Sequence, residues 1–158
     1  MAMKRIISEY KELLKDPNYL YSVEMTDNIL VWNFLMFGPS DTLYENGVFS
    51  GKICFTKNYP NEPPEVLFNQ DMLHPNIYKD GRVCISILHS GSDQWGYEDD
   101  SERWSPTQSV NTIMLSIISL LSAPNFESPA NVDMSTLQKS DYQTYKKKVY
   151  HLVANTLN

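Results

Sequence analysis

Cysteine is scarce in this sequence, which holds only Cys54 and Cys84 among its 158 residues. Two cysteines cannot build a framework of several disulfides, and they do not have the short spacing of a redox or zinc motif. The segment MAMKRIISEYKELLKD mixes charged and apolar residues, so it lacks the unbroken apolar stretch of a secretory signal. These absences predict a protein of the reducing, cytoplasmic interior of the cell.

Long apolar runs and an excess of positive charge are missing too. The most apolar segment, IMLSIISLL at residues 113–121, is about half as long as a membrane-spanning helix needs to be. Lysine and arginine number 13 against 19 aspartates and glutamates, which gives a net charge of −6. Because nucleic acids and anionic membranes attract basic surfaces, we expect no nucleic-acid partner and no direct membrane insertion. The expected partners are proteins.

Apolar periodicity predicts a helix followed by strands. The first segment places apolar residues at helical spacing and ends at Asp16-Pro17. Its predicted packed face consists of Ile6, Tyr10, Leu13 and Leu14. Four short β-rich runs follow, separated by polar or Gly-bearing turns, at residues 19–25, 29–37, 47–55 and 65–68. Consecutive hairpins are the simplest connection between them, so the sequence predicts an antiparallel meander.

Helical patterns return after Trp104. Ser105 is the predicted N-cap of a central helix, with Pro106 at its first position and Gln108 closing a capping box. A broad apolar stripe predicts that this helix is buried: Val110, Ile113, Met114, Ile117, Ile118 and Leu121. A final helix is expected from about Asp141, with its inward face formed by Tyr142, Tyr145, Val149, Leu152 and Val153.

The order of these elements predicts an α+β fold. Its expected parts are an N-terminal helix, a four-stranded antiparallel meander sheet, a long loop, a buried central helix and C-terminal helices. We expect one domain over residues 1–158, because a chain of this length hides roughly 70% of its unfolded surface when it folds.

The long loop, residues 69–104, is expected to be functional or disordered, since ordinary connections are much shorter. Its motif HPNIYKDGRVCIS at 74–86 places Cys84 after two turn signals, HPN and KDG, which keep the thiol near the surface. Cys54 lies instead in the apolar run GKICF, where a buried small hydrophobe is expected. Farther on, HSGSDQWGYEDDSERW forms an acidic loop punctuated by glycines.

From the residues alone, Cys84 has several interpretations. It can pack as a small hydrophobe, or it can be the nucleophile of a thiol hydrolase. The spacing does not select a base for that hydrolase among His74, His89 and His151. A zinc site built from Cys54, Cys84, His74 and His89 lacks the paired spacing of zinc ligands.

The motif His74-Pro75-Asn76, followed by Gly81, Cys84 and a WSP tripeptide that begins at Trp104, resembles the catalytic core of the ubiquitin-conjugating enzymes. The resemblance runs from the first helix through YPNEPP to the final helix. The longer motif HPNIYKDGRVCISILH, with an acidic insertion at about 89–103 before ERWSPTQSV, resembles the subgroup associated with degradation of endoplasmic-reticulum proteins. In typical members the cysteine and the tryptophan are much closer together.

The resemblance implies a transferase that needs no cofactor or metal. Such an enzyme accepts ubiquitin as a thioester on Cys84 from the ubiquitin-activating enzyme, in an ATP-dependent pathway. It then transfers ubiquitin to lysine with a RING-type ligase, here for protein degradation. A non-catalytic ubiquitin-binding variant of the same fold is the remaining alternative, which the presence of Cys84 disfavours.

The resemblance also implies roles for the motif. Asn76 supplies its side-chain amide, either to the oxyanion that forms when lysine attacks or to the shape of the loop. His74 is expected to be a hydrogen-bonding residue of the turn, and Pro75 fixes that turn. No histidine stands next to Cys84 in the sequence, which fits a nearly energy-neutral thiol exchange without a base that would also activate water.

One position departs from the family. Many members carry an aspartate before a proline shortly after the buried helix, and the matching residue here is Ser128. A carboxylate near the incoming lysine helps to orient and deprotonate the amine. We expect the acidic insertion to replace it by folding over Cys84, through Glu98, Asp99, Asp100 or Glu102, with His89 at the border of the same groove. The alternative is a solvated loop.

Partner surfaces are implied by the same resemblance. The first helix, with Lys4, Arg5 and Lys11 exposed, resembles the docking site for the activating enzyme, which overlaps the ligase surface; its alternative is an ordinary solvated face. The ligase surface is expected to include Asn61, Glu62, Ser105, Pro106 and Thr107. Many relatives place a bulky apolar residue where Asn61 or Glu62 stands. A partner protein would have to recruit the enzyme to the cytosolic face of the endoplasmic reticulum.

Overall fold

The computed structural model describes residues 1–158. Helix α1 (Ala2–Lys15) precedes four strands, β1 (Tyr21–Met25), β2 (Val31–Phe37), β3 (Val48–Cys54) and β4 (Glu65–Phe68). Two 3₁₀ turns, η1 (Ser86–Leu88) and η2 (Asp100–Glu102), interrupt the long loop. Helices α2 (Val110–Ser122), α3 (Val132–Ser140) and α4 (Tyr142–Asn155) complete the chain. The predicted α+β fold is confirmed.

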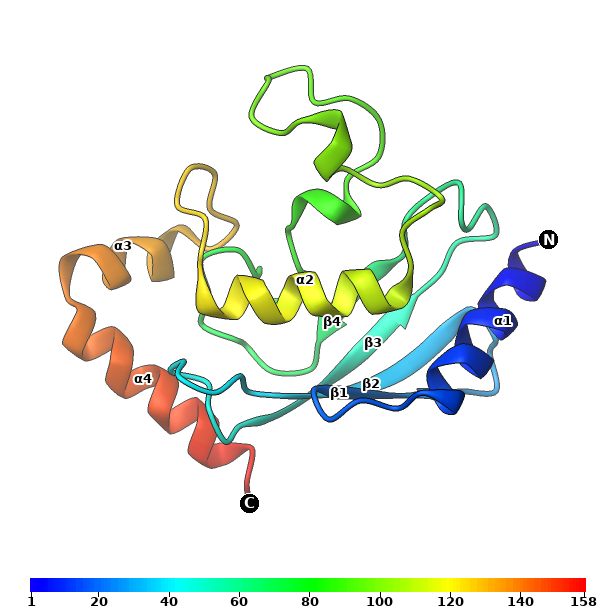
Figure 1. The fold of residues 1–158 in the computed structure, drawn as a ribbon. Helices are drawn as coiled ribbons and strands as arrows, with labels where there is room; N and C mark the ends of the chain where they lie inside the picture. The colour runs from blue at the N-terminus through cyan, green and yellow to red at the C-terminus, as the bar shows by residue number, and fades with distance from the viewer.

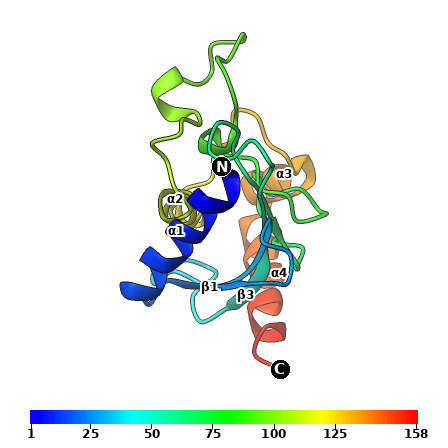
Figure 2. The same cartoon turned by 90° about the vertical axis from the view of Figure 1, so that its right-hand side faces the viewer.

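The four strands form one antiparallel sheet in the order β1-β2-β3-β4, as the hairpin pattern predicts. Helix α2 crosses one face of this sheet, with α1 near one end and α3 and α4 near the other (Figure 1). The view in Figure 2 looks along α2 and shows the loop that follows η1 rising away from the sheet. No helix is both long enough and apolar enough to span a membrane.

The core lies between the sheet and α2. Strand β2 alternates buried and exposed residues, and its inward side chains are Trp32, Phe34 and Met36. Helix α2 buries Ile113, Met114 and Ile117 completely, as its apolar stripe predicts. Each such side chain contributes about 1.5–3 kcal/mol to folding. This packing fixes α2 as the support for the loops at its two ends.

The predicted start of the central helix is wrong. Ser105 and Gln108 lie in a turn closed by the Gln108 N–H and the Ser105 carbonyl, and α2 begins at Val110. The N-cap is Ser109, which forms a capping box with Thr112. The helix starts later than predicted because the side chain of Arg5, on α1, binds the carbonyls of Pro106 and Gln108 in this turn.

The C-terminal region contains α3 as a separate helix before α4, which begins one residue after the predicted start. Helix α3 has a weak apolar pattern, with Val132 exposed and Ser135 buried, so periodicity did not reveal it. In α4 the predicted inward residues Tyr145, Val149 and Val153 are buried, whereas Tyr142 is exposed. On α1, Leu14 is likewise exposed instead of packed.

Candidate active site

The turn before Cys84 is organised around a buried histidine. The His74 Nε2–H donates to the Leu120 carbonyl at 2.8 Å, and its Nδ1 accepts from the Asn76 N–H at 3.0 Å. Complete burial lowers the pKa of His74 to about 4, against the opposing effect of the Leu120 carbonyl. The ring is therefore neutral near pH 7, and it ties the turn to the C-terminal part of α2.

A tight hairpin then returns the chain to Asn76. The Gly81 N–H donates to the Tyr78 carbonyl, and the Cys84 N–H donates to the Asn76 carbonyl at 2.9 Å. Gly81 has a φ of +99°, and a Cβ there would lie 2.0 Å from the Phe68 carbonyl oxygen, so only glycine fits. This hairpin places Cys84 beside Asn76.

Asn76 is 3% exposed, and its side-chain amide both donates and accepts a hydrogen bond. Its Nδ2 donates to the Asn125 carbonyl at 2.7 Å, and its Oδ1 accepts from the Asn125 N–H at 2.8 Å. The amide therefore holds the loop after α2 against the Cys84 turn. Ser128 in that loop lines the same groove as Cys84.

The structure places a histidine beside the thiol, although none stands next to Cys84 in the sequence. The η1 turn reverses the chain, so that His89 Nε2 lies 3.8 Å from Cys84 Sγ. The other ring nitrogen, Nδ1, lies 2.8 Å and 3.1 Å from the two carboxylate oxygens of Glu98. The side-chain order is thiol, imidazole, carboxylate. The expectation that no histidine neighbours the thiol is therefore wrong, and His89 lies in the groove at whose border it was expected.

This contact changes the charge of the imidazole. The hydrogen bond to the Cys84 sulfur raises the pKa of His89 to about 9; burial opposes this rise, and the Glu98 carboxylate reinforces it. His89 is therefore an imidazolium at pH 7 in the free enzyme. A protonated imidazole stabilises a neighbouring thiolate and cannot accept a proton from water.

Arg103 anchors the acidic loop, which we define as residues 89–103. Its guanidinium donates to the Gly91 carbonyl at 2.6 Å and the Ser90 carbonyl at 2.9 Å, and it pairs with Glu98. The next residue, Trp104, donates its N–H to the His89 carbonyl at 3.0 Å. The two ends of the loop are thus joined above the thiol.

A groove of roughly 650 Å³ opens at Cys84, and we call it the thiol groove. Six predicted site residues line it: Asn76, Cys84, His89, Glu98, Glu102 and Ser128. Asp99 and Asp100 are exposed and do not line it. The other eight residues of the groove were not predicted as site residues: Ile85, Ser86, Asp93, Trp95, Tyr97, Leu120, Asn125 and Glu127. Of these, Asp93 had a sequence signal as part of the acidic run.

Of the other sequence-based interpretations, the hydrolase arrangement keeps one candidate base and is set aside only by the family comparison below, whereas the zinc site does not match this geometry. Of the three candidate bases only His89 meets Cys84, because His74 is used inside the turn and His151 is exposed on α4. No group of three or more His, Cys, Asp and Glu side chains is placed to hold a metal ion, so the zinc interpretation is wrong. Cys54 is half-buried at the end of β3 instead of fully buried, and burial raises the pKa of its thiol.

The predicted partner surface is continuous, with one correction. Lys4 and Lys11 are exposed on α1, but Arg5 is bound within the molecule. Its guanidinium pairs with Glu9 at 2.8 Å and donates to the carbonyls of Pro106 at 3.1 Å and Gln108 at 2.8 Å. These bonds explain the displaced start of α2. Arg5 therefore joins α1 to the turn at 105–108.

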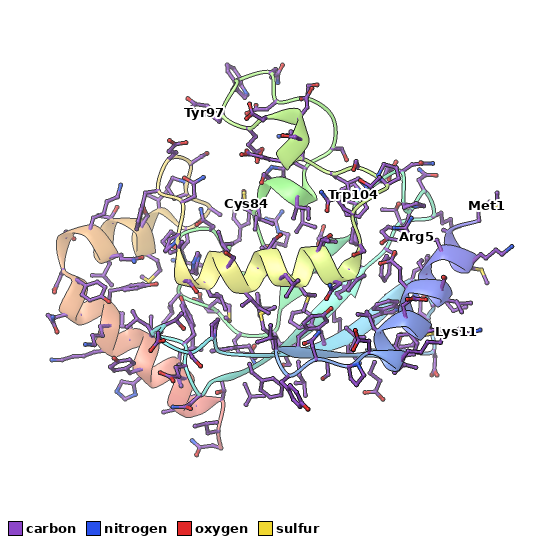
Figure 3. All side chains as sticks on the ribbon, in the orientation of Figure 1. Met1, Arg5, Lys11, Cys84, Tyr97 and Trp104 are labelled. Atoms are coloured by element: carbon purple, nitrogen blue, oxygen red, sulfur yellow. The ribbon has the colours of Figure 1, made fainter.

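The remaining residues of that surface lie in neighbouring loops. Asn61, Glu62, Pro106 and Thr107 are exposed, and Ser105 is half-buried with its hydroxyl 2.7 Å from that of Thr107. The Trp104 indole N–H donates to the Pro60 carbonyl at 2.8 Å and joins the two loops. Figure 3 shows Arg5, Lys11 and Trp104 on the side of the molecule that carries α1, with Cys84 toward its centre.

Comparison with known proteins defines the class to which this fold and thiol groove belong. The family model described as "Ubiquitin-conjugating enzyme" matches residues 5–153, and the chain belongs to this family. Its members are transferases that act through a cysteine thioester. Ubiquitin, an activating enzyme and a ligase are the partners that membership implies.

Particular relatives match over nearly the full chain. "Ubiquitin-conjugating enzyme E2 7" of Arabidopsis thaliana is 51% identical over 92% of this chain and 89% of its own length. "Ubiquitin-conjugating enzyme E2 G2" of Homo sapiens is 46% identical over 99% of this chain and 96% of its own length. "Probable ubiquitin-conjugating enzyme E2 7" of Caenorhabditis elegans is 52% identical over 97% of this chain and 93% of its own length.

Proposed function

We propose that Cys84 is the thiol that carries ubiquitin. The observation that supports this most is the position of its Sγ, at the thiol groove and 3.8 Å from an imidazolium. The other cysteine, Cys54, has no such neighbour and a thiol pKa raised by burial. A thiolate is the nucleophile in thiol exchange, so His89 favours Cys84 for this role.

Two transfers follow at this sulfur. In the first, the Cys84 thiolate attacks the thioester carbonyl of ubiquitin on the activating enzyme; the new C–S bond forms as the old one breaks, and the activating enzyme's thiolate leaves. In the second, a neutral lysine amine attacks the Cys84 thioester. The C–N bond forms, the amine proton passes to water, and the Cys84 thiolate leaves. His89 stabilises the same thiolate as nucleophile and as leaving group.

Asn76 and the carboxylates serve the second transfer. We assign Asn76 to the loop that faces the attacked carbonyl, where its amide can donate to the oxyanion or hold Asn125 in place. Glu98 and Glu102 line the same groove as Ser128 and supply the negative charge that orients the incoming amine. His74 and Pro75 keep the turn in shape.

The partner and cellular assignments rest on the resemblance to the family. The activating enzyme and a RING-type ligase dock on α1, through Lys4 and Lys11, and on the loops with Asn61, Glu62, Ser105, Pro106 and Thr107. The chain acts as one catalytic core with its insertion at about 89–103. The long acidic loop supports a cytoplasmic role in protein degradation, with a partner protein that recruits the enzyme to the endoplasmic reticulum.

Intact mass spectrometry tests the proposal. After incubation with activating enzyme, ATP and ubiquitin, the protein should gain the mass of one ubiquitin, and a thiol reductant should remove it. Omission of ATP is the control. A protein that gains no mass, or whose added mass resists the reductant, would contradict a thioester carrier.

A further inference from the structure

Two exposed aromatic side chains stand at the outer end of the acidic loop. Trp95 is 76% exposed and Tyr97 is 71% exposed, yet both line the thiol groove. Figure 3 shows Tyr97 on the loop above Cys84. Large aromatic side chains left open to water next to a reaction site mark a surface that binds something. The transfers described above make no use of them.

A hydrogen-bonded turn presents these two rings. The Asp93 carboxylate accepts from the backbone N–H groups of Trp95 at 2.9 Å, Tyr97 at 2.7 Å and Glu98 at 3.0 Å. Gly96 lies between the rings with a φ of +75°, in the left-handed region that favours glycine. The rings are therefore held by a defined backbone and do not belong to an unstructured loop.

The charge of the groove indicates what the rings meet. Its lining includes four carboxylates, from Asp93, Glu98, Glu102 and Glu127, and no lysine or arginine. The one cation in the lining, His89, is paired with Glu98, so the other three carboxylates leave the groove negative. Carboxylates attract cations, and the faces of Trp and Tyr bind ammonium and guanidinium groups as well as the methylene stems that carry them. This combination is complementary to a basic polypeptide and unsuited to an acidic one.

We propose that Trp95 and Tyr97 recognise the polypeptide that flanks the acceptor lysine, and that they favour segments carrying neighbouring lysines or arginines. The inference rests on the proposed function, in which Cys84 holds ubiquitin while the lysine approaches through the thiol groove. In this arrangement the two rings contact residues beside the acceptor lysine, and the reacting amine itself passes them toward the thioester. They are specificity-determining residues.

The test is a single round of discharge from purified thioester. The acceptors are two peptides of equal length, each with one lysine, flanked by arginines in one and by serines in the other, together with free lysine. Trp95→Ala/Tyr97→Ala should raise KM for the arginine-flanked peptide about tenfold, with kcat changed less than about twofold, since two exposed cation–π contacts are lost. The preference over the serine-flanked peptide should largely disappear.

Two matched variants complete the test. Trp95→Phe/Tyr97→Phe keeps both aromatic faces and should retain the preference. Tyr19→Ala removes another exposed tyrosine, just before β1, and should change nothing. Unchanged discrimination between the peptides in the alanine variant would overturn the proposal, as would an equal loss with free lysine, which would mean that the rings act on the carried ubiquitin. Failure of the unaltered enzyme to form a thioester would instead overturn the proposed function.

Discussion

At the scale of single residues, the Cys84–His89–Glu98 contact determines the chemistry of the thiol. A cysteine beside an imidazole also occurs in thiol hydrolases, in which the imidazole of the resting enzyme can be charged as well. Here the hydrogen bond to the Cys84 sulfur raises the pKa of His89 to about 9, so the ring is protonated at pH 7. The charge of His89 alone therefore does not separate a carrier thiol from a hydrolase, and the family to which the chain belongs makes that distinction.

The raised pKa predicts a pH-dependent contribution to stability. A histidine whose pKa rises from 6.5 to about 9 on folding stabilises the protein fully below pH 6.5, and this stabilisation is lost as the pH rises through 9. His89→Gln should lower the free energy of unfolding by about 1 kcal/mol at pH 6, a discounted value because the ring is partly exposed. The difference should vanish at about pH 10.

Urea unfolding of both proteins across this pH range measures the effect. His151→Gln, at an exposed position on α4, is the matched control. A deficit of the His89 variant that stays constant from pH 6 to about pH 10 would contradict the protonated ring.

Asn76 gives a second prediction at this scale. Asn76→Ala should leave the transfer from the activating enzyme nearly unchanged and slow discharge to lysine about a hundredfold, the effect of losing one oxyanion donor. Asn76→Asp is the matched variant, because it keeps an acceptor for the Asn125 N–H and loses the amide donor. Rates of both steps come from single-round assays; equal slowing of both by Asn76→Ala would assign Asn76 to loop shape alone.

At the scale of elements, the acidic loop has an inner and an outer set of carboxylates. Glu98 and Glu102 line the thiol groove, whereas Asp99 and Asp100 are exposed outside it. Arg103 and the Trp104 N–H close the base of the loop. The acidic loop can therefore act on the amine in two ways that the sequence does not distinguish. The inner carboxylates can orient the amine by direct contact, and all the carboxylates together contribute a negative electrostatic potential.

This separation predicts unequal effects of charge removal. Glu98→Gln/Glu102→Gln should slow discharge to free lysine about tenfold, most strongly at low pH where the amine is largely protonated. Asp99→Asn/Asp100→Asn removes the same charge from the outer set and should leave the rate within about twofold. Discharge from purified thioester is measured across pH. Equal slowing by both pairs would indicate a field effect, and no slowing by either would indicate a solvated loop.

Helix α1 is attached to α2 through a half-buried carboxylate, that of Glu9. Glu9 accepts from the Val110 N–H at 2.8 Å, from the Tyr59 hydroxyl and from Arg5. Glu9→Ala leaves these donors unpaired and should cost about 2–3 kcal/mol in urea unfolding. Glu12→Ala, on the exposed face of the same helix, should cost less than about 0.5 kcal/mol. Equal losses would contradict the anchoring role.

Sequence patterns predicted the elements whose form follows from burial, and they failed where contacts between distant segments decide the structure. Strands β1 to β4 and the buried stripe of α2 were predictable, because alternation and helical periodicity follow directly from burial. The start of α2 was not, because Arg5 and Glu9, far away in the chain, bind the turn at 106–110. His89 was expected at the border of the groove, but its direct contact with Cys84 was not predictable for a similar reason: only the η1 turn brings them together.

At the scale of the whole molecule, the predicted partner surface and the thiol groove are connected by side chains. Arg5 joins α1 to the turn at 105–108, and Trp104 joins Pro60 to the carbonyl of His89. Trp104 therefore links the surface assigned to the ligase to the backbone of His89, and the side chain of His89 contacts Cys84. The core between the sheet and α2 supports both regions.

The central claim, that Cys84 alone carries ubiquitin, is tested most directly by the mass of the adduct in two serine variants. Cys84→Ser should form an oxyester that survives thiol reductant, because an alkoxide is a much poorer leaving group than a thiolate. Cys54→Ser should still form an adduct that the reductant removes completely. An equal loss of adduct in both variants, or a reductant-sensitive adduct on Cys84→Ser, would contradict the account.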